Sequence, residues 1–182
     1  MMDEQNTSFQ IRAAASADNF LLAEVGAETF FDTFAVDNTP ENMAAYLAAS
    51  FSPEKQAEEL ADPATKFLLI ELKNQRVGFA RLKFGQAPAE VLSLRPMEIV
   101  RIYVRKNWIG FGAGGRLIQA CLDEAAHAGC DKVWLDVWEY NDRAIAFYRK
   151  WGFEKVGIQA FKLGDELQND LVMVRPVNIK AA

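Results

Sequence analysis

Apolar and polar positions divide the chain into a helical first third and a strand-rich remainder. A short alternating run at 9–12 predicts the first strand. Three helices are expected after it, because capping residues and prolines mark three starts, near 16–18, 39–40 and 52–53. The first of these helices is expected to end near 34 and the third near 60.

The middle of the chain changes to short apolar runs, which are typical of strands. Runs at 67–72 and 77–84 flank a four-residue turn at 73–76 and predict a hairpin. A loop at 86–96 then leads to a further predicted strand at 97–104.

The predicted strand at 97–104 carries charged side chains among its apolar ones. Period-two alternation puts Glu98 on one face together with Ile102 and Val104, while Arg101 and Tyr103 share the opposite face. Glu98 is therefore expected on the other side of the sheet from Arg101.

The last part of the chain predicts two helices and three strands. Glycines crowd positions 110–115, and apolar residues at helical spacing over 117–125 predict a helix that Gly129 ends. Asn141 is expected to cap a second helix. Strands are expected at 133–138, which is almost wholly apolar as if covered on both faces, and near 154–162 and 170–175.

This order of elements predicts an α/β (α+β) fold. One mixed, mostly antiparallel sheet of about six to seven strands would be flanked by helices. A single crossover unit at 97–138 would bring two strands together in parallel. The pattern is continuous over 8–176, which indicates one domain with tails at 1–7 and 177–182.

Composition and charge argue against several classes of protein. Of 182 residues, 51% are hydrophobic and 25% are charged, which suits one well-filled core. The net charge of −5 argues against a nucleic-acid partner, and no apolar run approaches the roughly 20 residues of a membrane span. The first nine residues are polar and acidic, unlike a signal peptide, and two cysteines are too few for a disulfide framework. A cytoplasmic protein is therefore expected.

Four glycines lie between the strand at 97–104 and the helix that follows it, at 110, 112, 114 and 115. A helix N-terminus offers unpaired N–H groups and a positive dipole, so this loop suits a phosphate or pyrophosphate. Its spacing also matches the dinucleotide pattern Gly-x-Gly-x-x-Gly, so a nicotinamide-dependent enzyme of Rossmann type is an alternative. Against that alternative, residues 105–109 separate the loop from its strand.

The surroundings of the loop resemble the GCN5-related N-acetyltransferase (GNAT) superfamily. The strand ends in Ile102-Tyr-Val104, and Gly112-Ala-Gly114 matches the glycines of the superfamily's pyrophosphate loop, although Ile109 stands where Gln or Arg is usual. Residues 141–153 are similar to its signature Asn-x-x-Ala-x-x-Phe-Tyr-x-x-x-Gly-Phe. The runs at 98–104, 137–139, 161–165 and 170–173 are similar to PaiA-type polyamine (spermidine/spermine) N-acetyltransferases.

This resemblance implies acetyl-CoA as co-substrate, no metal, and a cleft where a parallel strand pair splays apart. The pantetheine arm would pair with the backbone of Ile102, Tyr103 and Val104 like an added strand. The pyrophosphate would meet the backbone of Gly110, Phe111, Gly112, Ala113, Gly114 and Gly115. The helix that Asn141 caps would line the cofactor through Asn141, Ala144 and Tyr148. Arg143, Lys150 or Arg116 would meet the remaining phosphate charge, or would be solvated surface charges.

Two catalytic roles follow from the same resemblance. Tyr148 would protonate the departing thiolate, and its alternative role is that of a core aromatic residue. Glu98, 14 residues before Gly112, would take a proton from the ammonium of the substrate, directly or through water. Its alternative role is a strand charge paired with an arginine. Glu139 is the second candidate for the base.

Charge distribution points to the class of acceptor. The segment 24–62 holds nine acidic residues and a single lysine, a net charge of −8, whereas the whole chain carries −5. A cationic small-molecule amine, first of all a polyamine, would be held there by Glu28 and Asp32, with Glu139 nearer the reaction. An amino sugar, an amino acid or a protein N-terminus is the alternative acceptor, and a non-catalytic acyl-CoA sensor is the alternative function. Aromatic residues in the last strands allow a homodimer.

Overall fold

The computed structural model describes residues 8–177, so the predicted tails lie outside the described residues except for Val177. Its helices are α1 (Asn19–Phe34), α2 (Pro40–Ser50), α3 (Pro53–Ala61), α4 (Ala113–His127) and α5 (Asp142–Lys150). Its strands are β1 (Gln10–Ala13), β2 (Thr65–Leu72), β3 (Gln75–Phe84), β4 (Pro96–Val104), β5 (Lys132–Trp138), β6 (Glu154–Leu163) and β7 (Glu166–Pro176). Within the described part, no helix is both long and apolar enough to cross a membrane.

The predicted fold class is confirmed. All seven strands form one sheet in the order β1-β2-β3-β4-β5-β7-β6, in which only β4 and β5 run parallel. A Rossmann arrangement, which needs a mostly parallel sheet, is therefore wrong for this chain.

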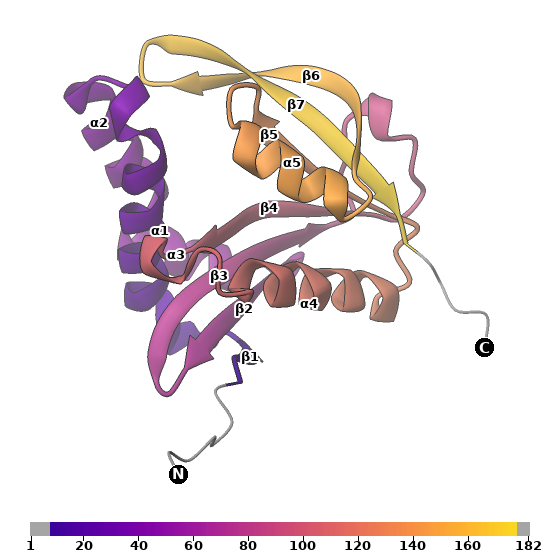
Figure 1. Ribbon diagram of the computed structural model, residues 1–182, viewed down its shortest axis with the longest axis horizontal. Coiled ribbons are helices and arrows are strands. Elements are labelled where there is room, and N and C mark those ends of the chain that lie inside the picture. Colours follow the sequence, from indigo (N-terminus) through magenta and orange to yellow (C-terminus); the bar gives the residue numbers. More distant parts are fainter. Residues whose placement is uncertain (1–7, 178–182) are drawn as a thin grey trace.

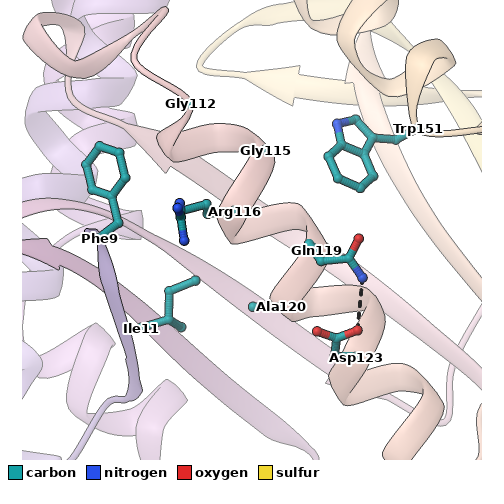
Figure 2. Close-up of a pocket in the computed structure, with 9 residues that line it drawn as sticks. All are labelled: Phe9, Ile11, Gly112, Gly115, Arg116, Gln119, Ala120, Asp123 and Trp151. Atoms are coloured by element: carbon teal, nitrogen blue, oxygen red, sulfur yellow. Dashed lines mark hydrogen bonds between the residues drawn. The ribbon is translucent and has the colours of Figure 1, made fainter. Parts of the chain in front are cut away.

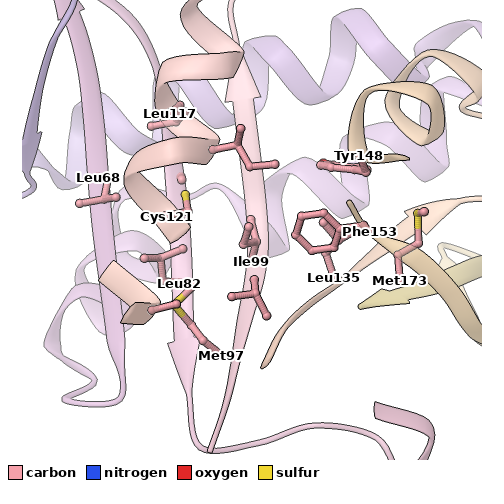
Figure 3. Close-up of a cluster of buried hydrophobic side chains, with 14 of the residues drawn as sticks. Leu68, Leu82, Met97, Ile99, Leu117, Cys121, Leu135, Tyr148, Phe153 and Met173 are labelled. Carbon is pink, nitrogen blue, oxygen red and sulfur yellow. The ribbon is translucent and has the colours of Figure 1, made fainter. Parts of the chain in front are cut away.

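Helices cover the two faces of the sheet differently (Figure 1). One face packs against α4 and α5, and the main core lies there, with Leu117, Cys121, Tyr148 and Phe153 among its buried residues (Figure 3). The other face meets α1 and α3 over the first strands, where Leu22 and Val25 pack on Phe67 and Phe79. Phe30 and Met43, from α1 and α2, enclose Leu163 of β6.

The predicted starts of α2 and α3 are confirmed by capping hydrogen bonds, whereas α1 begins after Asp18 without one. The hydroxyl of Thr39 accepts from the N–H of Asn42 at 3.2 Å, and the hydroxyl of Ser52 accepts from Lys55 at 3.1 Å. A proline follows each of these caps at the first helical position, where its missing N–H costs nothing.

Several predicted boundaries were wrong by a few residues. The hairpin of β2 and β3 turns on two residues, Lys73 and Asn74, not on the four at 73–76, and both have positive φ. Such a turn matches the twist of paired strands. The first strand begins at Gln10 instead of 9, and the loop at 86–96 contains a short 3₁₀ turn at Ala89–Val91.

The final hairpin is longer than predicted, because β7 begins at Glu166 instead of 170. Its tip reaches α2, where the side-chain oxygen of Asn42 accepts from the N–H of Asp165 at 3.4 Å. Gly164, with φ +60°, leaves no room there for a side chain, which would collide with Asn42. Close packing of hairpin tip and helix therefore requires a glycine.

A β-bulge in β4 overturns the predicted faces of that strand. Arg81 of β3 pairs with Arg101 and Leu82 pairs with Ile99, so Val100 is an extra residue without a partner on β3. The bulge resets the alternation, so Ile99 and Ile102 both face the main core. Glu98 consequently lies on the same face as Arg101 and Tyr103, not opposite to them.

Candidate functional site

The two parallel strands separate soon after they meet. Pairing of β4 with β5 ends at Glu98 and Trp134, although both strands continue. Beyond that point β4 pairs only with β3, so the backbone of Ile102, Tyr103 and Val104 faces β5 without strand pairing. An extended chain can add to such a free strand edge through backbone hydrogen bonds.

The glycine segment lies at the same end of β4. Gly110 and Gly112 have φ of +89° and +87°, and a Cβ at either would point into open space. The helix α4 begins at Ala113, so Gly114 and Gly115 belong to its first turn and not to the loop. No side chain caps this helix start, which leaves the first N–H groups available to an anion. Phe111 is 70% exposed beside them.

A surface groove of about 490 Å³ follows the exposed side of α4 from this helix start. Gly112, Gly115 and Arg116 line its upper end, with Phe9 on one side and Trp151 on the other (Figure 2). Arg116 is therefore the one of the predicted phosphate cations that lines the groove at the helix start. Arg143 and Lys150 are exposed on α5, and neither has an ion pair within residues 8–177.

Helix α5 presents the predicted stripe of Asn141, Ala144 and Tyr148. The side-chain oxygen of Asn141 accepts from the N–H of Ala144 at 3.1 Å, so Asn141 is the helix cap and keeps its amide donors for another partner. Tyr148 is 9% exposed, and its ring packs in the main core next to Phe153 (Figure 3). Burial raises the pKa of Tyr148, so its hydroxyl stays protonated at neutral pH.

Glu98 lies half-buried on the face of the sheet opposite α4 and α5. Burial, together with the nearby carboxylate of Asp136, raises the pKa of Glu98 to about 7. The cations Arg81, Lys83 and Arg101 oppose this rise. A carboxylate with a pKa near neutrality can both accept and release a proton at physiological pH.

Two further carboxylates, Asp136 and Asp170, lie on this face and were missed by sequence reasoning. Asp136 accepts a hydrogen bond from Gln159 of β6, and burial raises the pKa of Asp136. Asp170 lies opposite Gln159 in the ladder, and burial with Asp136 raises the pKa of Asp170 to about 6. The signal for Asp136 was its place as the only charged residue within an apolar run at 133–138.

Aromatic side chains from α1 and α2 stand next to these acids. The ring of Phe34 meets Trp138 of β5 with centroids 5.9 Å apart, and Tyr46 meets Phe161 of β6 at 5.7 Å. By strand alternation, Trp138 and Phe161 share the face that carries Asp136. The acids are thus bordered by apolar walls, which explains their raised pKa values.

The predicted acceptor residues of α1 are exposed. Glu28 pairs with Arg105 at 2.9 Å, and Glu24 shares the same guanidinium at 2.5 Å. Asp32 is exposed and forms no ion pair within the described residues. Glu139 follows β5 and accepts from the side-chain amide of Asn169 at 3.1 Å. Glu28 therefore already has an ion-pair partner within the chain, whereas the carboxylate of Asp32 is available to a ligand.

The chain is similar to known acetyltransferases at the level of the family and of individual sequences. The family model described as the acetyltransferase (GNAT) family matches residues 28–153, which is more than half of the chain. An uncharacterised N-acetyltransferase of Lactobacillus delbrueckii subsp. lactis is 32% identical over 149 residues, covering 82% of this chain and 86% of its own. An uncharacterised N-acetyltransferase of Mycobacterium tuberculosis is 36% identical over 154 residues, covering 85% and 94%.

Solved structures with the same architecture are named for different activities. The PaiA N-acetyltransferase of Thermoplasma acidophilum in complex with coenzyme A has a TM-score of 0.74 at 22% identity, covering 93% of this chain and 99% of its own. The ribosomal-protein-S18-alanine N-acetyltransferase of Escherichia coli has a TM-score of 0.70 at 16% identity, covering 96% and 97%. At these identities the likeness shows a shared fold.

Proposed function

This chain belongs to the acetyltransferase (GNAT) family and is an N-acetyltransferase of that type, and we propose that it moves the acetyl group of acetyl-CoA to a primary amine of a cationic small molecule, first of all a polyamine such as spermidine or spermine. The observation that carries this proposal is the position of Glu98. It is a half-buried carboxylate with a pKa of about 7, on the strand whose free edge faces the splayed cleft.

Acetyl-CoA fits the features at the C-terminal end of β4. The pantetheine arm would add to the free backbone of Ile102–Val104, and the pyrophosphate would meet the uncapped N–H groups at the start of α4. A negatively charged pyrophosphate is favoured there by the helix dipole. Remaining phosphate charge falls to Arg116, Arg143 or Lys150, which are exposed near that helix start or on α5.

The chemical step needs one proton acceptor and one proton donor. An alkylammonium is mostly charged at pH 7, so Glu98 takes a proton from it, directly or through water. The neutral nitrogen then attacks the thioester carbonyl carbon, and the C–S bond breaks as the new C–N bond is completed. The acetylated nitrogen loses its second proton to water, and water returns a proton to Tyr148 after the thiolate has taken one. Tyr148, which burial keeps protonated, donates its proton to the departing thiolate.

A cationic acceptor is supported by the acids on the acceptor face and on α1. Asp136 stands near Glu98 and Asp170 stands near Asp136, and the aromatic walls beside them suit the methylene chain of a polyamine. Asp32 is the carboxylate proposed for a distal ammonium, with Glu28 in a weaker role because Arg105 already neutralises it, and Glu139 is proposed nearer the reaction. The competing acceptors are an amino sugar, an amino acid and a protein N-terminus.

An acceptor screen with detection of free CoA thiol tests this proposal. Spermidine and spermine should be turned over with a higher kcat/KM than a simple monoamine, an amino acid or an N-terminal peptide. Asp32→Asn should raise the KM for spermidine with little change in kcat, and added salt should weaken spermidine binding. No preference for polyamines, together with no salt effect, would refute the polyamine part alone.

Two other outcomes would refute, respectively, the transferase activity and the role of Glu98. Acetyl-CoA binding without turnover of any amine would mean an acyl-CoA sensor. Wild-type turnover in Glu98→Gln would remove the proposed base, and the matched control Glu154→Gln, an exposed residue at the start of β6, should stay fully active.

A further inference from the structure

A buried cluster of charged side chains lies between α3 and the sheet, and its residues have no role in the proposed reaction steps. Glu59 of α3 is 6% exposed and accepts from Arg81 of β3 at 2.8 Å and from Arg101 of β4 at 2.7 Å. The side chains of Arg81 and Arg101 are only 11% and 10% exposed. Arg101 also lies over the ring of Phe51, 4.8 Å from its centroid. These three residues, Glu59, Arg81 and Arg101, are called the arginine cluster below.

The β-bulge at Val100 places the arginine cluster beside Glu98. Lys83 pairs with Glu98 and Arg81 pairs with Arg101, so Arg81 is a diagonal neighbour of Glu98 on the same face. Without the extra residue, strict alternation would turn Arg101 toward the apolar core under α4. One inserted residue thus brings the guanidinium group of Arg101 to the side of the sheet that already carries Glu98 and Arg81.

The charges of the arginine cluster do not balance. Two guanidinium groups share a single carboxylate, and the buried Nε of Arg81 has no hydrogen-bond partner within the described residues. A purely structural ion pair would be cheaper with one arginine, because a second buried cation costs desolvation without a second anion. The surplus positive charge therefore favours another anion, and among the carboxylates on this face Glu98 is the diagonal neighbour of Arg81 in the ladder.

Glu98 is thus held between charges of opposite sign. Lys83 and Arg81 face it from β3, Arg101 from its own strand, and Asp136 from β5. Asp170 of β7 lies beyond Asp136, and Glu59 of α3 lies behind the guanidinium groups. Burial and Asp136 favour protonated Glu98, whereas the three cations favour its charged form.

We propose that Arg81 and Arg101, oriented by Glu59, are positioning residues that hold Glu98 in its charged form so that it can take the proton of the acceptor ammonium. The proposal rests on the proposed role of Glu98. The arginine cluster touches neither the acetyl group nor the amine and acts only through the field at Glu98. Glu59 limits this field by neutralising one of the two cations.

Removing members of opposite charge gives shifts of opposite sign. Arg81→Met should shift the acidic limb of the pH profile of kcat/KM to higher pH by roughly 1 unit, because a cation near Glu98 is lost. Glu59→Gln should move the same limb downward by a similar amount, because both guanidinium groups lose their counter-charge. Arg81→Lys should restore most of the wild-type profile. Each profile is measured with one amine, so that the pKa of the acceptor cancels between variants.

A surface ion triplet offers the matched control. Arg12 pairs with Asp18 at 2.8 Å and with Glu71 at 3.2 Å, and its side chain is 42% exposed. Arg12→Met should leave the pH profile unchanged. Melting temperature and KM for acetyl-CoA are recorded for every variant, because damage to packing alone would lower stability without opposite shifts of the acid limb.

The outcomes separate this inference from the proposed function. If the wild type acetylates no amine, the proposed function fails, and if Glu98→Gln keeps full turnover, the proposed role of Glu98 fails. If both of those tests succeed and Arg81→Met and Glu59→Gln shift the acid limb in the same direction, or not at all, the inference is wrong. Arg81→Gln, which keeps a donor for Glu59, replaces Arg81→Met if the latter does not fold. Failure of all these variants to fold would show that the arginine cluster is only structural.

Discussion

Glu98→Gln should stabilise the folded protein at pH 8 while it abolishes the proposed proton transfer. The pKa of Glu98 rises from an ordinary value of 4.5 to about 7 on folding, so the folded state binds the extra proton between these values. Stability from this group is therefore fully present below pH 4.5 and is lost as the pH rises through 7. Above pH 7 the wild type carries the whole cost of a charged, half-buried carboxylate.

The size of this cost follows from the shift. A rise from 4.5 to about 7 corresponds to about 3 kcal/mol at most. Solvent screening of a half-buried side chain reduces this value to about 1–2 kcal/mol. For a chain of this length such a change moves the melting temperature by about 3–6 °C. Gln is nearly isosteric and uncharged, and Glu98 has no hydrogen-bond partner to lose among residues 8–177.

The assay is thermal unfolding followed by tryptophan fluorescence at pH 8 and at pH 5. The melting temperature of Glu98→Gln should exceed that of the wild type at pH 8, and most of this difference should vanish at pH 5. The exposed Glu154→Gln should match the wild type at both pH values. An equal change at pH 5 and pH 8 would show that Glu98 titrates normally, and the argument for it as a base near neutrality would fall.

Three further predictions concern the co-substrate, the proton donor and the acid beside the base. Gly112→Asp should abolish the rise in melting temperature that acetyl-CoA causes, whereas Gly85→Asp, with the same positive φ and the same open space, should keep it. Tyr148→Phe should lower turnover roughly 100- to 10,000-fold with little change in acetyl-CoA affinity, and wild-type turnover would return this residue to a packing role. Asp136→Asn should move the acid limb of kcat/KM downward, since it removes a like charge near Glu98, and an upward shift would contradict the charge assignment.

Features that depend on local chemistry were predictable from the sequence. Thr39, Ser52 and Asn141 cap helices because each side-chain oxygen reaches an N–H three residues ahead, and this needs no distant contact. The strand and helix order follows from the periodicity of apolar residues for the same reason. The positive φ of Gly110 and Gly112 likewise agrees with the residue type, because glycine has no Cβ to oppose it.

Features that depend on pairing between distant strands were not predictable. Asp136 and Asp170 come together because β7 is inserted between β5 and β6, so residues 34 positions apart share one face. Local patterns contain no information on that strand order. The turn at Lys73 and Asn74 was misjudged because neither residue is a glycine, although Asn tolerates positive φ.

The bulge at Val100 links the fold to the proposed chemistry. In a regular β4, Ile99 and Ile102 would face opposite sides of the sheet, because they stand an odd number of residues apart. With the bulge both enter the core under α4, and Glu98 joins Arg101 and Tyr103 on the acceptor side. The bulge also coincides with the region where β4 leaves β5, because pairing stops at Glu98. The same irregularity therefore coincides with the free strand edge and places Arg101 on the face that carries Glu98, the proposed base.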